Sequence, residues 1–324
     1  MMRTAKIPNT ELSPSVLCLG TVNLGATIDR ETSFTILDAF FEHGGTFIDT
    51  AKIYSDWIPG EKSRSEKVIG EWMRERKNRE RVILATKGAH PELSSMHTSR
   101  LSKQEITADL EASLRHLQVD YIDLYWLHRD DPARPIAEIL ETLASLVRFG
   151  KIRYYGCSNW HLERIQEAQA YAVENGMAGF SGIQNLWNLA KVNTESLADP
   201  TLVVMDQPLW NFHRKTQLAA IPFSSQANGL FQKLESGQVE RISEGQRRMF
   251  LNPETEKRFR GVQALKAQTG LTTSQIVLGY LTGQPFPTFP IIGPQNMEQL
   301  EDSLRAADLR LTQEQIRFLV GDVM

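Results

Sequence analysis

The sequence predicts a (β/α)8 barrel, an α/β fold of the TIM-barrel type. Eight short runs of β-branched and other apolar residues recur along the chain, and long amphipathic stretches separate them. Several runs, such as residues 82–85, are apolar throughout, which is typical of strands buried on both faces of a parallel sheet. No change of composition marks a second domain, so we expect one barrel domain over residues 1–324.

Each element of the predicted barrel can be assigned to a segment. Strands are expected at 16–21, 46–50, 81–87, 121–128, 154–158, 182–185, 219–224 and 289–293, and helices at 33–43, 65–77, 103–116, 136–149 and 161–174. Asp29 precedes the first helix as a capping residue, and Ser102 and Glu105 have the spacing of a capping box. Gly150 and Gly176 follow two later helices, where a left-handed residue commonly ends a helix.

Four segments fall outside the eight repeated units. The first 15 or so residues are expected to form a small hairpin before the first strand. Residues 195–217 are predicted to be irregular, and 224–253 to form a long polar loop after the seventh strand. Long loops inside compact domains are usually functional or disordered, and this one follows a strand at the barrel face that carries active sites. A last helix is expected at 314–320.

A doubly wound parallel sheet is the alternative fold. The count of eight strands argues against it. In addition, no Gly-x-Gly-x-x-Gly sequence follows the first predicted strand, as the dinucleotide-binding version of that fold would require.

Composition narrows the functional classes. The chain has 324 residues and a formal net charge of −3, so it lacks the basic surface that nucleic-acid binding requires. Its two cysteines, Cys18 and Cys157, are far apart in apolar runs, which favours a reducing compartment over a disulfide scaffold. The N-terminal residues lack the apolar core of a signal peptide, and no stretch is apolar enough for a membrane helix. These features predict a cytoplasmic globular protein.

Four polar residues are expected to converge at the mouth of the barrel. Asp49, Lys87 and His128 end three successive predicted strands, and Tyr54 follows Asp49 in the next loop. A lysine near a phenol lowers the pKa of that phenol, and a carboxylate keeps the lysine charged. Such a phenol can act as a general acid, while a neutral histidine donates a hydrogen bond to a carbonyl.

This set contains no nucleophile and no metal-binding motif. The sequence has no His-Glu-x-x-His, Cys-x-x-Cys or Gly-x-Ser-x-Gly. Acid catalysis at a carbonyl without a nucleophile favours hydride transfer, which requires a cofactor.

The sequence resembles the aldo-keto reductase family. The resemblance extends from about Leu12 to Thr312, and its motifs are 47–54, 85–87, 124–128, 156–160 and the C-terminal 291–294 with 298–302. It implies that Tyr54 is the general acid, that Lys87 lowers its pKa, that Asp49 pairs with Lys87, and that His128 orients the carbonyl. It also implies a nicotinamide dinucleotide bound in extended form across the barrel mouth, without a Rossmann unit.

The resemblance assigns cofactor contacts along the whole chain. Ser158, Asn159 and Gln184 match residues that bind the nicotinamide carboxamide, and Phe223 matches an aromatic residue stacked on the ring. The cofactor-binding residues that it implies are Gly20, Thr21, Ser158, Asn159, Gln184, Phe223, Ser224, Gln226, Asn228, Gly293, Gln295, Asn296 and Gln299.

Two departures from the family pattern concern the cofactor. The resemblance implies that the loop 224–229, after the seventh strand, binds the pyrophosphate of the cofactor. Ser225 and Asn228 stand in this loop where the family commonly has a proline and an arginine. Gln295 and Asn296 stand where members that prefer NADPH have a basic residue followed by Ser or Thr. A neutral amide cannot make a charge-assisted bond to a phosphate. We expect NADP(H) as the cofactor, with NAD(H) also used and the preference for NADPH reduced.

The substrate is expected to be a small aldehyde or ketone, such as a sugar. Trp57 lies three residues after Tyr54, Asn23 follows the first strand and Arg129 follows His128. An aromatic side chain beside polar groups suits a small polar carbonyl compound. The oligomeric state stays open, and no nucleic-acid or membrane partner is expected.

Two other functions are considered. One is a redox-sensing partner subunit with little turnover, like the potassium-channel β-subunits of the same family. The other is a barrel glycosidase that uses two of Asp130, Asp131 and Glu61 as its acids. Cys157, beside Ser158, is interpreted as a buried residue of a strand rather than a reactive thiol.

Overall fold

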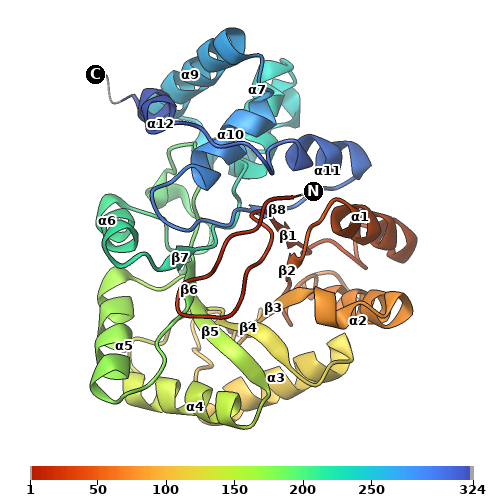
Figure 1. Cartoon of the computed structure of the whole chain (residues 1–324), viewed down its shortest axis with the longest axis vertical. Helices are drawn as coiled ribbons and strands as arrows, with labels where there is room; N and C mark the ends of the chain where they lie inside the picture. The colour runs from red at the N-terminus through yellow and green to blue at the C-terminus, as the bar shows by residue number, and fades with distance from the viewer. Residues whose placement is uncertain (1, 322–324) are drawn as a thin grey trace.

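A single sheet of parallel strands forms the centre of the computed structural model, which describes residues 2–321 (Figure 1). The strand order follows the chain from β1 to β7, and β8 lies beside β1. The strands are β1 (Cys18–Gly20), β2 (Phe47–Asp49), β3 (Ile83–Gly88), β4 (Ile122–Leu127), β5 (Ile152–Ser158), β6 (Gly182–Gln184), β7 (Ala219–Ala220) and β8 (Ile291–Ile292). All eight lie within or overlap the predicted segments, so the strand assignment is confirmed.

The sheet closes into a barrel between β7 and the segment before β8. The Phe289 amide donates to the Ala220 carbonyl at 2.8 Å, and Ala220 forms a parallel bridge with Thr288. Closure excludes the doubly wound alternative. β7 and β8 are shorter than predicted because Pro222 and Pro290 have no N–H to continue the ladder.

The five predicted helices are present between the strands: α1 (Arg30–Glu42), α2 (Arg64–Arg76), α3 (Lys103–Leu117), α4 (Ile136–Arg148) and α5 (Leu162–Glu174). The Asp29 carboxylate caps α1 by accepting from the Thr32 amide at 2.8 Å. Both hydrogen bonds of the predicted capping box between Ser102 and Glu105 are formed at the start of α3. The predicted capping residues at the starts of α1 and α3 are therefore confirmed.

Two segments that were predicted without regular structure contain helices. Residues 195–217 include α6 (Gln207–Thr216), and 224–253 include α7 (Leu230–Glu235) and α8 (Glu244–Phe250) with the 3-10 turns η3 (Ala227–Gly229) and η4 (Val239–Arg241). Pro208 falls in the first turn of α6, where a missing N–H costs nothing, and Asp206 caps that helix. The prediction of irregular backbone was therefore wrong at α6, and the loop after β7 is partly helical.

The remaining elements complete the rim of the barrel. They are η1 (Arg79–Arg81), η2 (Thr194–Ser196), α9 (Pro253–Thr269), α10 (Thr273–Thr282), α11 (Met297–Leu304) and α12 (Gln313–Val320). α12 confirms the predicted last helix. α9, α10 and α12 pack together at one end of the molecule around a second hydrophobic cluster that includes Val262, Ile276 and Leu319 (Figure 1).

The predicted N-terminal hairpin is present and lies across one end of the barrel (Figure 1). Thr4 and Ser15 form an antiparallel bridge, and the Ile7 amide donates to the Leu12 carbonyl at 2.9 Å. Ile7 and Leu12 pack against Phe47 and other side chains inside the barrel. The hairpin leads directly into the amino end of β1, and Ser15 bonds to Thr46 just before β2. It therefore covers the amino ends of the strands, and the carboxyl ends stay open for a site.

Among residues 2–321, no helix has both the length and the apolar composition needed to cross a membrane.

Candidate active site

The four polar residues predicted to converge do meet at the carboxyl ends of β2, β3 and β4. The Lys87 ammonium is an ion-pair partner of the Asp49 carboxylate, and both side chains are 1% exposed. Lys87 Nζ also donates to the Tyr54 hydroxyl at 2.7 Å and to the Thr50 carbonyl at 2.9 Å. Neighbouring parallel strands bring these side chains together, since Asp49 and Lys87 end adjacent strands.

Burial and charge act against each other at this cluster. Burial lowers the pKa of Lys87, but the Asp49 carboxylate and Tyr54 outweigh it, so that the pKa lies above its usual value. Burial raises the pKa of the Tyr54 phenol, and the Lys87 charge opposes this only in part. The Lys87 ammonium thus lowers the pKa of Tyr54, but burial has the larger effect, so that the pKa lies above its usual value. Tyr54 remains a protonated phenol at neutral pH, the form that donates a proton.

His128 faces Tyr54 across the cavity. Their ring centroids are 6.0 Å apart, and the planes meet edge-on at 76°. Burial lowers the pKa of His128 well below its usual value, and Arg129 adds to the effect. His128 is therefore neutral near pH 7, so one of its ring nitrogens donates and the other is a bare acceptor.

A single long cavity of about 1160 Å³ runs from these residues across the barrel mouth. It exceeds the range of roughly 300–1,000 Å³ common for small-ligand pockets, as an extended ligand requires. Of the expected cofactor residues, twelve line it: Gly20, Ser158, Asn159, Gln184, Phe223, Ser224, Gln226, Asn228, Gly293, Gln295, Asn296 and Gln299. Thr21 is fully buried beneath the cavity, where its hydroxyl contacts the Asp49 carbonyl and Ser65.

Gln184 and Asn159 are held by neighbouring strands. The Gln184 amide donates to Asp49 Oδ1 at 3.1 Å, so it orients the carboxylate that pairs with Lys87. Asn159 adopts a left-handed backbone (φ 59°), which asparagine tolerates, and its amide donates to Ser158 Oγ at 3.0 Å. These contacts fix amide and hydroxyl groups on the cavity wall beside Tyr54.

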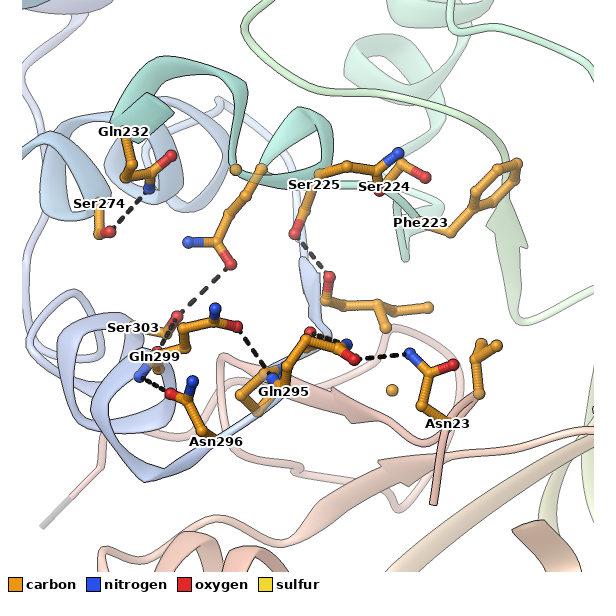
Figure 2. A pocket seen from close by; sticks show the side chains of 18 of the residues that line it. Asn23, Phe223, Ser224, Ser225, Gln232, Ser274, Gln295, Asn296, Gln299 and Ser303 are labelled. Atoms are coloured by element: carbon orange, nitrogen blue, oxygen red, sulfur yellow. Dashed lines mark hydrogen bonds between the residues drawn. The ribbon is translucent and has the colours of Figure 1, made fainter. Parts of the chain in front are cut away.

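The loop after β7 forms one wall of the cavity (Figure 2). Ser224, Ala227, Asn228 and Gly229 all have positive φ angles. Left-handed residues interrupt regular pairing and turn backbone N–H groups outward, as in many anion-binding loops. The Ser225 hydroxyl donates to the Ile291 carbonyl at 2.5 Å and ties this wall to β8.

The opposite wall is built by the segment after β8. Asn296 caps α11 by accepting from the Gln299 amide at 3.0 Å, and the Gln299 side chain accepts from the Gln295 amide at 2.9 Å (Figure 2). Gln295 in turn accepts from the Asn23 amide at 3.2 Å. The side chains of Gln295 and Asn296 are thus already bonded within the protein, Gln295 to Asn23 and to the Gly293 carbonyl, and Asn296 to the Gln299 backbone.

The expected substrate residues occupy different positions. Asn23 and Arg129 line the cavity, whereas Trp57 is 53% exposed and does not line it. The Arg129 guanidinium donates to Thr201 Oγ1 at 2.7 Å, to Asp199 Oδ2 at 2.8 Å and to the His128 carbonyl at 2.8 Å. Arg129 therefore fastens the segment after β6 to the end of β4.

Sequence reasoning missed four residues of the site. Lys233, Arg241 and Arg305 bring positive charge to the cavity wall from α7, η4 and the end of α11. The Lys and Arg residues in the loop after the seventh strand could have suggested cations at the site, but nothing in the sequence shows whether their side chains face the cavity. His90, in the turn that follows β3, packs on His128.

These residues fit a nicotinamide dinucleotide. The cavity is large, amide and hydroxyl groups line it beside Tyr54, and cations and a loop of left-handed residues also belong to its wall. Asp130 is paired with Arg164 and Glu61 with Lys67, and the cavity wall contains neither acid, which argues against the glycosidase. Within the described residues, no group of three or more His, Cys, Asp or Glu side chains could hold a metal ion.

Comparison with known proteins agrees with this geometry. Residues 16–320 match the Aldo/keto reductase family. The uncharacterized oxidoreductase YrpG of Bacillus subtilis is 32% identical, covering 98% of this chain and 95% of that protein. Norsolorinic acid reductase stcV of Emericella nidulans is 30% identical (95% and 78% covered), and the NADP(+) aryl-alcohol dehydrogenase of Phanerodontia chrysosporium is 31% identical (96% and 83%).

The fold is also that of a solved structure. The thermostable aldo-keto reductase Tm1743, crystallised with the inhibitor epalrestat, superposes with a TM-score of 0.73 at 23% identity, covering 99% of both chains. The similar proteins named above are reductases, dehydrogenases or oxidoreductases, so the redox-sensing partner role gains no support from them.

Proposed function

The chain belongs to the aldo/keto reductase family and is an NAD(P)-dependent oxidoreductase of carbonyl compounds, and from this premise we propose that Tyr54 protonates the substrate carbonyl as it is reduced. The observation that carries the proposal is the contact of 2.7 Å between Lys87 Nζ and the Tyr54 hydroxyl, with Asp49 behind it. A bound nicotinamide would supply the hydride. All other steps belong to side chains of this protein.

In the proposed reaction, the Tyr54 hydroxyl and one ring nitrogen of His128 donate hydrogen bonds to the carbonyl oxygen. The Lys87 ammonium stabilises the phenolate that remains when the proton leaves Tyr54, and the Asp49 carboxylate keeps this ammonium in place. His128 stays neutral because of its burial and of Arg129, so it orients the carbonyl without competing as an acid.

We also propose how the cofactor is held. Ser158, Asn159 and Gln184 bind the carboxamide end and Phe223 stacks on the ring, while the loop from Ser224 to Gly229 receives the pyrophosphate. The cofactor is NADP(H), with NAD(H) also accepted. A relative at 31% identity is named for NADP(+), and Lys233, Arg241 and Arg305 line the cavity, where Glu298, Glu301 and Asp302 balance their charge.

The substrate is an aldehyde or ketone, and we propose one with an apolar body. Val22, Leu24, Ile28 and Leu202 line the cavity that Tyr54 shares. Two of the relatives are named for an aryl alcohol and for norsolorinic acid. A sugar, the other candidate, would depend on the Asn23 amide for its hydroxyl contacts.

The test is turnover with a panel of aromatic aldehydes, aliphatic aldehydes and sugars, followed by oxidation of NADPH or NADH. Tyr54→Phe keeps the ring and removes the proton donor, so kcat should fall by about 10²–10⁴. Binding of the cofactor, measured by quenching of protein fluorescence, should stay within about twofold of the native protein. Wild-type kcat in Tyr54→Phe would disprove the assigned acid, and faster turnover of sugars than of aryl aldehydes would disprove the substrate class.

A further inference from the structure

His90 lies in a short, firmly anchored turn that follows β3. The preceding residue, Ala89, has a left-handed backbone (φ 59°), which is uncommon for alanine, and its amide donates to Asp109 Oδ2 at 2.9 Å. Arg100 donates to the His90 carbonyl at 3.0 Å and is itself paired with Asp109. A strained residue persists only where its surroundings hold it, so the position of His90 is specified on both sides.

The side chain of His90 is as closely fixed as its backbone. Its Nδ1 lies 2.6 Å from the Pro91 carbonyl, and because a carbonyl can only accept, this nitrogen carries the proton. The ring packs edge-on against His128, with centroids 4.6 Å apart and planes at 67°. Both histidines are 8% exposed. His128 thus has two neighbouring aromatic rings, His90 at 4.6 Å and Tyr54 at 6.0 Å between centroids.

His128 lacks the hydrogen bond that usually orients a functional imidazole. In most such sites one ring nitrogen bonds to a carboxylate or carbonyl, and this bond sets both tautomer and ring orientation. Among residues 2–321, the buried Nδ1 of His128 has no hydrogen-bond partner. Packing must therefore determine how the ring is turned.

We propose that His90 is a positioning residue that holds the His128 ring by edge-on packing, so that Nε2 is presented to the carbonyl while Nδ1 stays buried. This inference rests on the role proposed above for His128. His90 acts through His128 and does not itself contact the substrate.

The electrostatic surroundings of His128 give the proposal a measurable consequence. The groups that face it are Lys87 on β3, Arg129 after β4, Tyr54 after β2 and His90 itself, with Asp199 paired to Arg129. Burial is the largest cause of its lowered pKa. Removing the His90 ring would admit water beside His128 and raise the pKa of His128 toward its ordinary value.

The experiment compares His90→Ala, which removes the ring, with His90→Phe, which keeps its shape without nitrogens. His213→Ala is the matched control, because His213 is also a buried histidine but stacks on Phe286 away from the cavity. Histidine signals of the unliganded protein are followed by NMR from pH 5 to 8, with His128→Asn used to assign the His128 signal. Steady-state kinetics over the same pH range give kcat and KM.

We expect His128 in the native protein and in His90→Phe to stay neutral, in one tautomer, over this range. In His90→Ala it should titrate or show mixed tautomers, kcat should fall about ten- to a hundredfold, and the acid limb of kcat/KM should move to higher pH. His213→Ala should alter stability and leave the titration of His128 and the pH profile unchanged. If His90→Ala does not fold, His90→Asn replaces it under the same measurements.

An unchanged His128 signal and kcat in His90→Ala would overturn the proposal. So would loss of kcat in His90→Phe equal to that in His90→Ala, because the nitrogens of His90 and not its packing would then be essential. A native protein that reduces no carbonyl compound would contradict the proposed function instead, and the NMR comparison would still decide whether His90 orients His128.

Discussion

The Lys87 ammonium contacts a carboxylate, a carbonyl and a phenol at once, and these contacts control how Tyr54 titrates. The positive charge lowers the pKa of Tyr54 against the larger, opposite effect of burial. Lys87→Met removes the charge and keeps the length of the side chain, so the pKa of Tyr54 must rise further. Oxidation of an alcohol requires the phenolate, so the rise of its rate with pH should move to higher pH in the variant, and kcat should fall about 10²–10⁴ at neutral pH.

The pH profile of alcohol oxidation checks this prediction. The control is the double variant Asp49→Asn/Lys87→Met, which leaves no unpaired buried carboxylate and should fold at least as well as Lys87→Met alone. A profile in Lys87→Met that shifts to lower pH would contradict the assigned role of the ammonium.

Gln295 is the second residue whose chemistry makes a specific prediction. In the proposed function it stands where family members that prefer NADPH have a basic residue, and its side chain binds Asn23 and the Gly293 carbonyl. The ratio of kcat/KM for NADPH over NADH should therefore rise about tenfold in Gln295→Arg, as one charge-assisted hydrogen bond is gained. Asn23→Ala, which removes the partner of Gln295 without adding charge, should leave the ratio unchanged. Strong selectivity for NADPH in the native protein would contradict the prediction.

At the scale of elements, Arg129 links the end of β4 to the segment that follows β6. The Arg129 guanidinium donates hydrogen bonds to Asp199 and Thr201, and Leu202, the next residue, lines the cavity. If Arg129 acts through this link, Arg129→Lys and Asp199→Asn should each raise KM, and the double variant should be little worse than either. Binding of the substrate by Arg129 itself, as expected from the sequence, would make the two effects independent and multiplicative.

This prediction is checked by a double-mutant cycle on KM together with limited proteolysis of residues 197–203. Cleavage there should be faster in both single variants than in the native protein. Arg134→Lys, at an exposed pair with Glu138, serves as the matched control and should change neither KM nor cleavage.

The elements that sequence patterns predicted correctly are those whose signals are local. Asp29, Ser102 and Glu105 sit next to the helices they cap, and apolar runs marked every strand. α6 was missed because Pro208 suggests a break unless its place in the first turn is known. The helices in the loop after β7 were missed because they are short and polar, and they owe their stability to packing on the rest of the barrel.

For the whole molecule, the sequence predicted which strand ends meet. It did not predict whether burial or the Lys87 charge has the larger effect on the pKa of Tyr54. Asp49, Tyr54, Lys87 and His128 could be placed together from the barrel topology alone. The raised pKa of Tyr54 could not be foreseen, because burial depends on side chains from several strands. The sequence also did not indicate that His90 and Arg305 belong to the site. His90 contacts only the His128 ring there, and Arg305 lines the cavity from the end of α11.

His213 links the stability of the whole molecule to pH. It is fully buried, its Nδ1 bonds to the Leu218 carbonyl at 2.7 Å, and its ring stacks on Phe286. Burial lowers the pKa of His213 to about 4, whereas in the unfolded chain it has the ordinary value near 6.5. Between these values the unfolded state binds the extra proton, so the folded state loses stability as the pH falls from about 6.5 toward about 4.

The full loss from this residue is about 3 kcal/mol of unfolding free energy. His213→Phe keeps a ring against Phe286 and cannot be protonated. It should therefore be less stable than the native protein at pH 7, where the bond to Leu218 is lost, and should lose less stability between pH 7 and pH 4.5. Urea unfolding at both pH values measures the difference, and carboxyl groups common to both proteins cancel. His97→Phe, at an exposed histidine, is the control; equal losses in His213→Phe and the native protein would show that His213 does not carry the acid sensitivity.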